Sequence, residues 1–302
     1  MPKDRHLQKP AKTAAPAAGK NKWKLLGFQM GPLSLWLIFF LIIPILVILY
    51  YSFCQRNPGG TIHHVFSLKN YIHFLGTPVY RKILIQSFVI AFNVTLFCLL
   101  TAYVPAYYIA TLKSRNRVLL LILLIVPFWT SLLIRNYSWI LILGREGIIN
   151  VYFMKWGLIS EPMNMLYTTA SVVVGLTHWA LPFMVFPIFL TIDGIDPDLA
   201  AAAKNLGANS FQAFLRITFP LSMPGVAAGC LLTFIMTIGA FVTPVLLGGS
   251  EDVMITMVIT ERFLRLYDLP FGSAASIIYL IIMLTFVLIY DRLIGLKRIM
   301  NM

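Results

Sequence analysis

Charged residues are scarce in this sequence, and their scarcity limits the kinds of protein that it can encode. They make up 12% of the 302 residues, whereas apolar residues make up 59% and the mean hydropathy is +0.82. A soluble domain carries roughly 25% charged residues. The composition therefore excludes an ordinary soluble domain and predicts a chain that lies largely in the lipid bilayer.

Motifs for catalysis, nucleotide binding and metal binding are also missing. The P-loop pattern G-x-x-x-x-G-K-[ST] does not occur, and the three cysteines are scattered without C-x-x-C spacing. His63, His64 and His73 could suggest a metal site, but they lack a helical register and are interpreted as part of an ordinary loop. The chain is therefore predicted not to be an enzyme and to hold no cofactor or metal of its own.

What the sequence has in abundance is long apolar runs. A membrane helix needs about 20 apolar residues, because about 30 Å of hydrocarbon is crossed at about 1.5 Å per residue. Six stretches meet this requirement, and the predicted fold is an all-α, polytopic membrane protein with about six transmembrane helices. The predicted spans are residues 28–53, 83–112, 118–143, 166–192, 222–247 and 269–290.

The net charge of +13 could point to nucleic acid, but the basic residues lie between and outside the apolar runs. If the N-terminus is cytoplasmic, the inside segments hold 15 of the 24 lysines and arginines. The positive-inside rule then places both termini in the cytoplasm. No nucleic-acid partner is expected. Residues 1–27 are predicted to form a disordered basic tail, and residues 28–296 a transmembrane domain.

The segment 196–220, between the fourth and fifth spans, has the signals of a short helix–turn–helix. Asp196 is a suitable N-cap, and Pro197 suits the first helical position. Gly207 can end the first helix in the left-handed conformation, and Ser210 can start a second helix. Pro220 is expected to close the segment before the next span. By local physics alone, this element could be a mere connector.

The spacing in this segment resembles the coupling loop of the membrane subunits of binding-protein-dependent ABC importers. That family shows E-A-A-x-x-x-G, nine further residues and then I-x-L-P. The positions that match are Ala202, Ala203, Gly207, Ile217 and Pro220. Ala201 replaces the family glutamate and Phe219 the leucine, and the first change puts in doubt any charge contact of that glutamate with the ATPase.

Other stretches are similar to the spermidine/putrescine-type permeases of this family. They include LILLIVPFWTSLLIRNY from Leu121 to Tyr137, Leu181-Pro-Phe-Met-Val, Leu247-Gly-Gly and Leu269-Pro-Phe-Gly. The resemblance implies a multi-pass permease of the bacterial inner membrane with type I importer architecture. It also implies three partners: a cytoplasmic ATPase dimer that binds the ATP, a second permease subunit that forms a heterodimer with this chain, and an extracytoplasmic solute-binding protein.

Within the apolar runs, Arg135 is the candidate pathway or gate residue, together with Trp129, Tyr137 and Trp179. A charge at membrane depth costs about 2.5–3.5 kcal/mol on insertion scales and tends to face a bundle interior or water. The alternative is that Arg135 extends to the outer interface among an aromatic belt. If the solute is a polyamine, its ammonium groups could meet the aromatic faces by cation–π attraction.

Two other functions stay open at this point. The same machinery could carry another small organic solute, such as an opine or a phosphonate, or ferric ion. A secondary transporter is a further alternative, but it usually has intramembrane acidic residues, and none lies within the predicted spans.

Overall fold

The computed structural model describes residues 34–57, 59–112 and 116–294, and it divides the chain into two units, residues 1–50 and 51–302. In the first unit, the described part is an uncharged apolar helix that begins at Ser34 and contains a π-helical stretch, η1 (Ile38–Ile42). It continues as α2 (Ile43–Ser52), whose last residues belong to the second unit. This helix agrees with the first predicted span, of which residues 28–33 lie outside the described residues.

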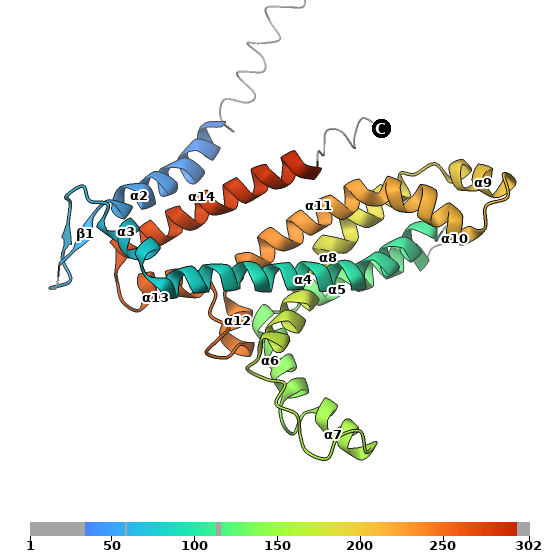
Figure 1. The fold of residues 1–302 in the computed structure, drawn as a ribbon, viewed down its shortest axis with the longest axis horizontal. Coiled ribbons are helices and arrows are strands. Elements are labelled where there is room, and N and C mark those ends of the chain that lie inside the picture. Colours follow the sequence, from blue (N-terminus) through green and yellow to red (C-terminus); the bar gives the residue numbers. More distant parts are fainter. Residues whose placement is uncertain (1–33, 58, 113–115, 295–302) are drawn as a thin grey trace, which may run out of the picture. The chain divides into compact units, whose positions relative to one another are not determined.

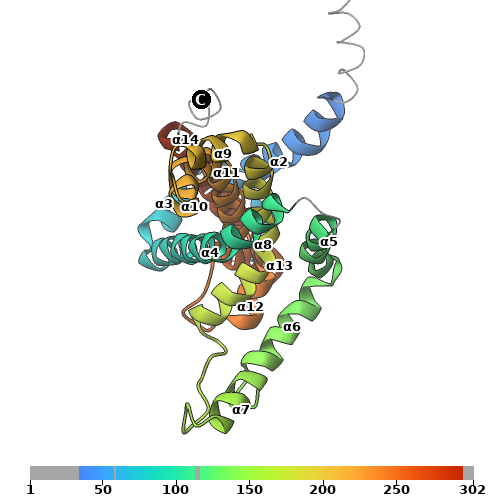
Figure 2. The same cartoon turned by 90° about the vertical axis from the view of Figure 1, so that its right-hand side faces the viewer.

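The second unit is almost entirely helical (Figures 1 and 2). Its small sheet pairs β1 (Gln55–Arg56) with β2 (Ile62–His63) in antiparallel register. The helices are α3 (Lys69–Gly76), α4 (Pro78–Thr111), α5 (Asn116–Trp129), α6 (Leu132–Leu143), α7 (Ile148–Lys155), α8 (Thr169–Asp193), α9 (Pro197–Asn205), α10 (Ser210–Ala213), η2 (Phe214–Thr218), α11 (Phe219–Ile238), α12 (Val242–Leu247), α13 (Ile255–Leu264) and α14 (Leu269–Ile294).

The core of this unit is formed by α4, α8 and α11, which pack along one another (Figure 1). Small residues allow the close packing: Ala102 and Ala106 on α4 are fully buried, and so is Ala180 on α8. Gly225 and Gly229 of α11 lie against α8, as expected for small residues four positions apart. A second cluster joins α3, α13 and α14 through Phe74, Ile255 and Phe271.

Five described helices are long and apolar enough to cross a membrane. The predicted second, fourth and sixth spans correspond to α4, α8 and α14 within a few residues. The segment 253–264, which is too short to span, forms the ten-residue helix α13.

The predicted third span differs from the structure. Instead of one helix over residues 118–143, the chain forms α5 and α6, and the two directions differ by 92° across the break. Ser131 has extended backbone (ψ 136°), and the Thr130 N–H and hydroxyl both bond to the Pro127 carbonyl oxygen. A proline within a helix removes one backbone hydrogen bond, and the helix breaks three residues later. This pair could account for a sixth span.

The predicted fifth span also differs at both ends. Pro220 does not close the hairpin, because the helix runs without interruption from Ser210 to Ile238. The π-helical turn η2 lies directly before Pro220, and the Phe219 N–H bonds to the Phe214 carbonyl oxygen, five residues back. This wider turn accommodates a residue that lacks an N–H. At the other end, α11 stops at Ile238, and α12 forms a separate short helix.

Candidate functional site

The hairpin of residues 196–220 begins and ends its first helix where the sequence predicts. The Asp196 carboxylate accepts a hydrogen bond from the Asp198 backbone N–H (2.9 Å), and Pro197 occupies the first turn of α9. Gly207 follows the helix with φ +90°, a conformation that side chains other than glycine rarely adopt. The Gly207 N–H bonds to the Lys204 carbonyl oxygen, so the turn is closed by backbone contacts.

The second helix is capped by Asn209, one residue before the predicted start. The Asn209 side-chain oxygen accepts from the Gln212 N–H (2.8 Å), and the Gln212 side-chain oxygen accepts from the Asn209 N–H (3.0 Å). This reciprocal pair is a capping box. It fixes the direction of the second helix relative to the turn.

The hairpin presents an exposed surface of small and apolar side chains at one end of the long helices (Figure 1). Ala201 and Ala202 are exposed, and so are Leu206 (90%) and Phe211 (67%). Among the other residues singled out from the sequence, Ala203 and Ile217 are half-buried and Pro220 is exposed. An isolated soluble face would rarely leave such side chains in water, so the surface is suited to a protein partner.

The hairpin is attached to α4 by an aromatic ring of its second helix, Phe214, and by two tyrosines that the sequence analysis did not single out. The Phe214 ring meets Tyr103 and Tyr107 of α4, with centroids 6.0 and 5.2 Å away. The Tyr103 hydroxyl also shares a hydrogen bond with Ser222 of α11 (2.9 Å). The hairpin is therefore in direct contact with α4, and its second helix continues into α11. The feature of the sequence that could have identified these two residues is the spacing of Tyr103 and Tyr107, which lie one helical turn apart.

A cavity of about 620 Å³ lies along α4, α6 and α8. Among the described residues, its polar lining comes from Asn93, Thr101, Trp139, Thr169, Thr177 and His178, and the histidine is the one acidic or basic side chain. The Trp139 Nε1–H donates to His178 Nδ1 (3.1 Å). Because the indole nitrogen can only donate, His178 Nδ1 must accept, and the neutral ring then carries its proton on Nε2.

The four candidate pathway residues do not form one cluster in the single subunit. Arg135 lies over the Phe128 ring (5.4 Å), and its Nε and Nη1 are buried without a hydrogen-bond partner among the described residues. Trp179 is half-buried, and its ring contacts Phe183, which in turn contacts Phe128. Trp129 and Tyr137 are 85% and 57% exposed.

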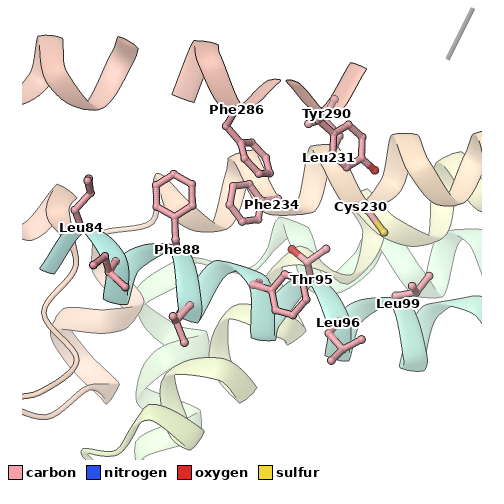
Figure 3. A pocket seen from close by; sticks show the side chains of 13 residues that line it. Leu84, Phe88, Thr95, Leu96, Leu99, Cys230, Leu231, Phe234, Phe286 and Tyr290 are labelled. Carbon is pink, nitrogen blue, oxygen red and sulfur yellow. The ribbon is translucent and has the colours of Figure 1, made fainter. Parts of the chain in front are cut away.

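A larger groove, about 790 Å³, lies between α4, α11 and α14 and is almost wholly apolar (Figure 3). The rings of Phe234 and Phe286 stack at 4.4 Å, and Phe88 lies nearby. The Tyr290 hydroxyl donates to the Ala227 carbonyl oxygen. A groove of this kind suits hydrocarbon, and the described residues that line it include no acidic side chain to pair with a cation.

No group of three or more His, Cys, Asp or Glu residues could hold a metal ion within the described ranges. His63 ends the small sheet, and His64 lies 3.8 Å from the Cys54 sulfur. His73 lies in α3, so the interpretation of these histidines as part of a loop is correct for His64 alone and wrong for His63 and His73.

Comparison with known proteins identifies the relatives of this chain. The sequence pattern of the family "Binding-protein-dependent transport system inner membrane component" matches residues 25–296. The spermidine/putrescine transport system permease protein PotB of Salmonella typhimurium (strain SL1344) is 41% identical over 273 residues, which cover 90% of this chain and 95% of the relative. PotB of Escherichia coli (strain K12) is 40% identical over 257 residues, covering 85% and 93%.

Solved structures show the same fold. A bacterial ABC transporter involved in the import of the acidic polysaccharide alginate matches with a TM-score of 0.75 and 18% identity, over 91% of this chain and 96% of that one. The alginate transporter in complex with its pentasaccharide-bound periplasmic protein gives a TM-score of 0.74 and 17% identity, over 90% and 94%. The chain belongs to the family of inner membrane components of binding-protein-dependent transport systems.

Proposed function

We propose that this permease subunit imports polyamines such as spermidine and putrescine. The observation that carries the proposal is the 41% identity to a spermidine/putrescine permease across nearly the full length of both chains. The cavity along α4, α6 and α8 is compatible with a cationic solute, because the described residues that line it include aromatic rings and no lysine or arginine. Aromatic faces attract ammonium groups by about 0.5–2 kcal/mol.

The same proposal includes the partners that supply energy and solute. A cytoplasmic ATPase dimer binds the ATP, a second permease completes the pathway, and an extracytoplasmic binding protein delivers the polyamine. Trp129 and Tyr137 are exposed on the single subunit, so they would line the pathway only where it meets the second permease. Arg135 would act as a gate nearby, since a polycation is repelled by its charge and not bound by it.

In this mechanism, residues 196–220 form the coupling loop. ATP binding draws the two ATPases together, and each ATPase carries the coupling loop that is seated on it. Phe214 then transmits the movement to Tyr103 and Tyr107, so that α4 and α11 turn as rigid bodies. The bias toward the outward-facing state comes from ATP and the loaded binding protein, each of which must bind that state better.

The substrate is tested by uptake. The chain is expressed with its native partner subunits in cells that lack polyamine uptake, and the entry of labelled spermidine and putrescine is measured with and without an excess of unlabelled competitors. We expect competition by polyamines and no competition by sulfate, opines, phosphonates or ferric ion. Competition by one of these instead would assign the chain to that solute, and uptake that survives ATP depletion would indicate a secondary transporter.

The coupling loop is tested with Gly207→Trp. A Trp side chain at φ +90° is strained and would project from the turn that faces the ATPase, whereas open space surrounds the position in the subunit itself. We expect solute uptake to be lost while the protein stays in the membrane and ATP hydrolysis continues. Gly157→Trp is the matched control, because Gly157 also has positive φ (+67°) and open surroundings but lies after α7. Full uptake by the Gly207 variant would contradict the assignment.

A further inference from the structure

The coupling hairpin contains a preformed hollow of about 340 Å³. One wall is the turn from Leu206 to Ala208, and the other is the first part of the second helix, with Gln212, Arg216 and Ile217. Both walls are rigid, since the Gly207 turn is closed by backbone hydrogen bonds and the helix start by the capping box. The hollow is therefore ready to receive a side chain without rearrangement.

The polar side chains that line this hollow, Gln212 and Arg216, present hydrogen-bond donors. Arg216 is exposed and takes part in none of the ion pairs formed among the described residues, and no acidic side chain lines the hollow. Gln212 already uses its side-chain oxygen to accept the Asn209 N–H, which leaves amide N–H groups. Asp196 and Asp198 lie at the opposite end of α9. An anionic group is the complement of this lining.

The backbone at Arg216 is unusual as well. Arg216 is the middle residue of the π-helical turn η2. Such turns are rare, occur mostly as single turns within α-helices and frequently lie at functional sites. The turn accommodates Pro220 and at the same time places Arg216 and Ile217 on the hollow. The π-helical turn therefore both lets the helix continue through Pro220 and shapes the wall of the hollow.

We propose that this hollow is a socket for an aspartate or glutamate side chain on the surface of the ATPase, with Arg216 as the charged anchor. The proposal rests on the assignment of residues 196–220 as the coupling loop. A carboxylate can bind a guanidinium through two parallel hydrogen bonds, which fixes orientation as well as contact. Exposed Leu206 and Phe211 would surround the ion pair and exclude water from it.

The first test measures how much ATPase stays bound to the purified complex over a series of salt concentrations. Arg216→Glu should retain about tenfold less ATPase than wild type at physiological salt, because a charge-assisted pair is replaced by repulsion. Arg292→Glu is the control, since Arg292 is an exposed arginine at the end of α14 outside the hollow. Retention equal to wild type in the Arg216→Glu complex would overturn the proposal.

The second test does not depend on a disruptive variant. Arg216→Lys keeps the charge and introduces an amine, which a carbodiimide joins to a contacting carboxylate with loss of water to the reagent. Mass spectrometry should find the substituted position linked to an Asp or Glu of the ATPase. Absence of this link in an intact, active complex would overturn the socket. If the Arg216→Glu complex retained the ATPase normally but lost bound anionic phospholipid, the socket would also be overturned, and Arg216 would be assigned to the membrane surface.

The two assignments can fail separately. If Gly207→Trp abolishes uptake while Arg216→Glu retains the ATPase and Arg216→Lys forms no link, the coupling loop stands and the socket falls. If neither position matters for uptake or assembly, the coupling-loop assignment falls with it.

Discussion

At the scale of single residues, Gly225 is where α11 comes closest to α8. A Cβ atom at this position would lie 2.5 Å from the Pro187 carbonyl oxygen and would also meet the Thr191 side chain. Gly225→Ala should therefore lower the free energy of unfolding by about 1–3 kcal/mol, the usual cost of overpacking a core. Thermal unfolding of the purified protein in detergent measures the effect.

The matched control for this prediction is Gly239→Ala at the C-terminal end of the same helix. A Cβ there would lie 3.5 Å from the Ile235 carbonyl oxygen, and the backbone conformation is ordinary (φ −82°). It should shift the unfolding temperature little. Equal losses in the two variants would mean that close packing against α8 is not what Gly225 provides.

Residues whose conformation depends on local chemistry were predictable from the sequence. The cap at Asp196 and the positive φ of Gly207 follow from neighbours within the same turn. The surroundings of Arg135 were not predictable, because its contact with Phe128 spans the break between α5 and α6, and Phe128 is packed against Phe183 of α8. A single sequence contains no direct record of such contacts.

At the scale of elements, Asp252 holds the loop between α12 and α13 against the start of α8. This carboxylate is 2% exposed and accepts hydrogen bonds from the Thr169 hydroxyl (2.5 Å) and the Gly249 N–H (2.9 Å). Asp252→Ala would leave both donors without this partner, at about 1–3 kcal/mol for each that stays buried and unsatisfied. We expect a clear loss of thermal stability and faster proteolysis of the loop.

The neighbouring acid gives the comparison for this prediction. Glu251 forms an ion pair with Lys82 (3.6 Å), but both side chains are more than 70% exposed. Exposed pairs of this kind contribute little, so Glu251→Gln should behave like wild type. If the Glu251 variant lost as much stability as the Asp252 variant, burial and hydrogen bonding would not explain the role of Asp252.

Long elements were predictable in type and approximate position, and their interruptions were not. Hydropathy reports where apolar helix can form, and α4, α8 and α14 follow it closely. The break before α6 depends on the backbone angles of a few residues after Pro127, which leave the apolar pattern unchanged. The continuous helix through Pro220 depends on the π-helical turn η2, whose presence cannot be predicted from the residue types in it.

At the scale of the whole molecule, Arg117 joins the start of α5 to the end of α8. Its guanidinium forms an ion pair with Asp193 and lies over the Phe189 ring (4.8 Å). Asp193 is three residues before the Asp196 cap of the hairpin, so this pair links α5 to the end of α8 that leads into the hairpin. About a third of each side chain is exposed, and screening limits the pair to no more than about 1 kcal/mol.

Charge reversal tests this link. Arg117→Glu and Asp193→Arg should each lower thermal stability and uptake, and the double variant, which exchanges the charges, should restore part of both. Because the pair is partly exposed, the differences should shrink at high salt. A double variant no better than the sum of the two single changes would show that the residues act independently.

The topology of the molecule depends on whether the bent pair α5–α6 crosses the membrane. With that pair the described chain has six candidate spans, and the two termini then lie on the same side as residues 113–117 and the hairpin, where most of the basic residues are. If the pair instead enters and leaves on one side, five spans remain and the termini lie on opposite sides.

We predict six crossings with both termini in the cytoplasm. A green fluorescent protein at the C-terminus should therefore fluoresce, and alkaline phosphatase at the same position should be inactive. Alkaline phosphatase inserted at Gly157, an open turn after α7, should be active and serves as the control. Active phosphatase at the C-terminus together with inactive phosphatase at Gly157 would exclude six crossings and make α5–α6 a re-entrant segment.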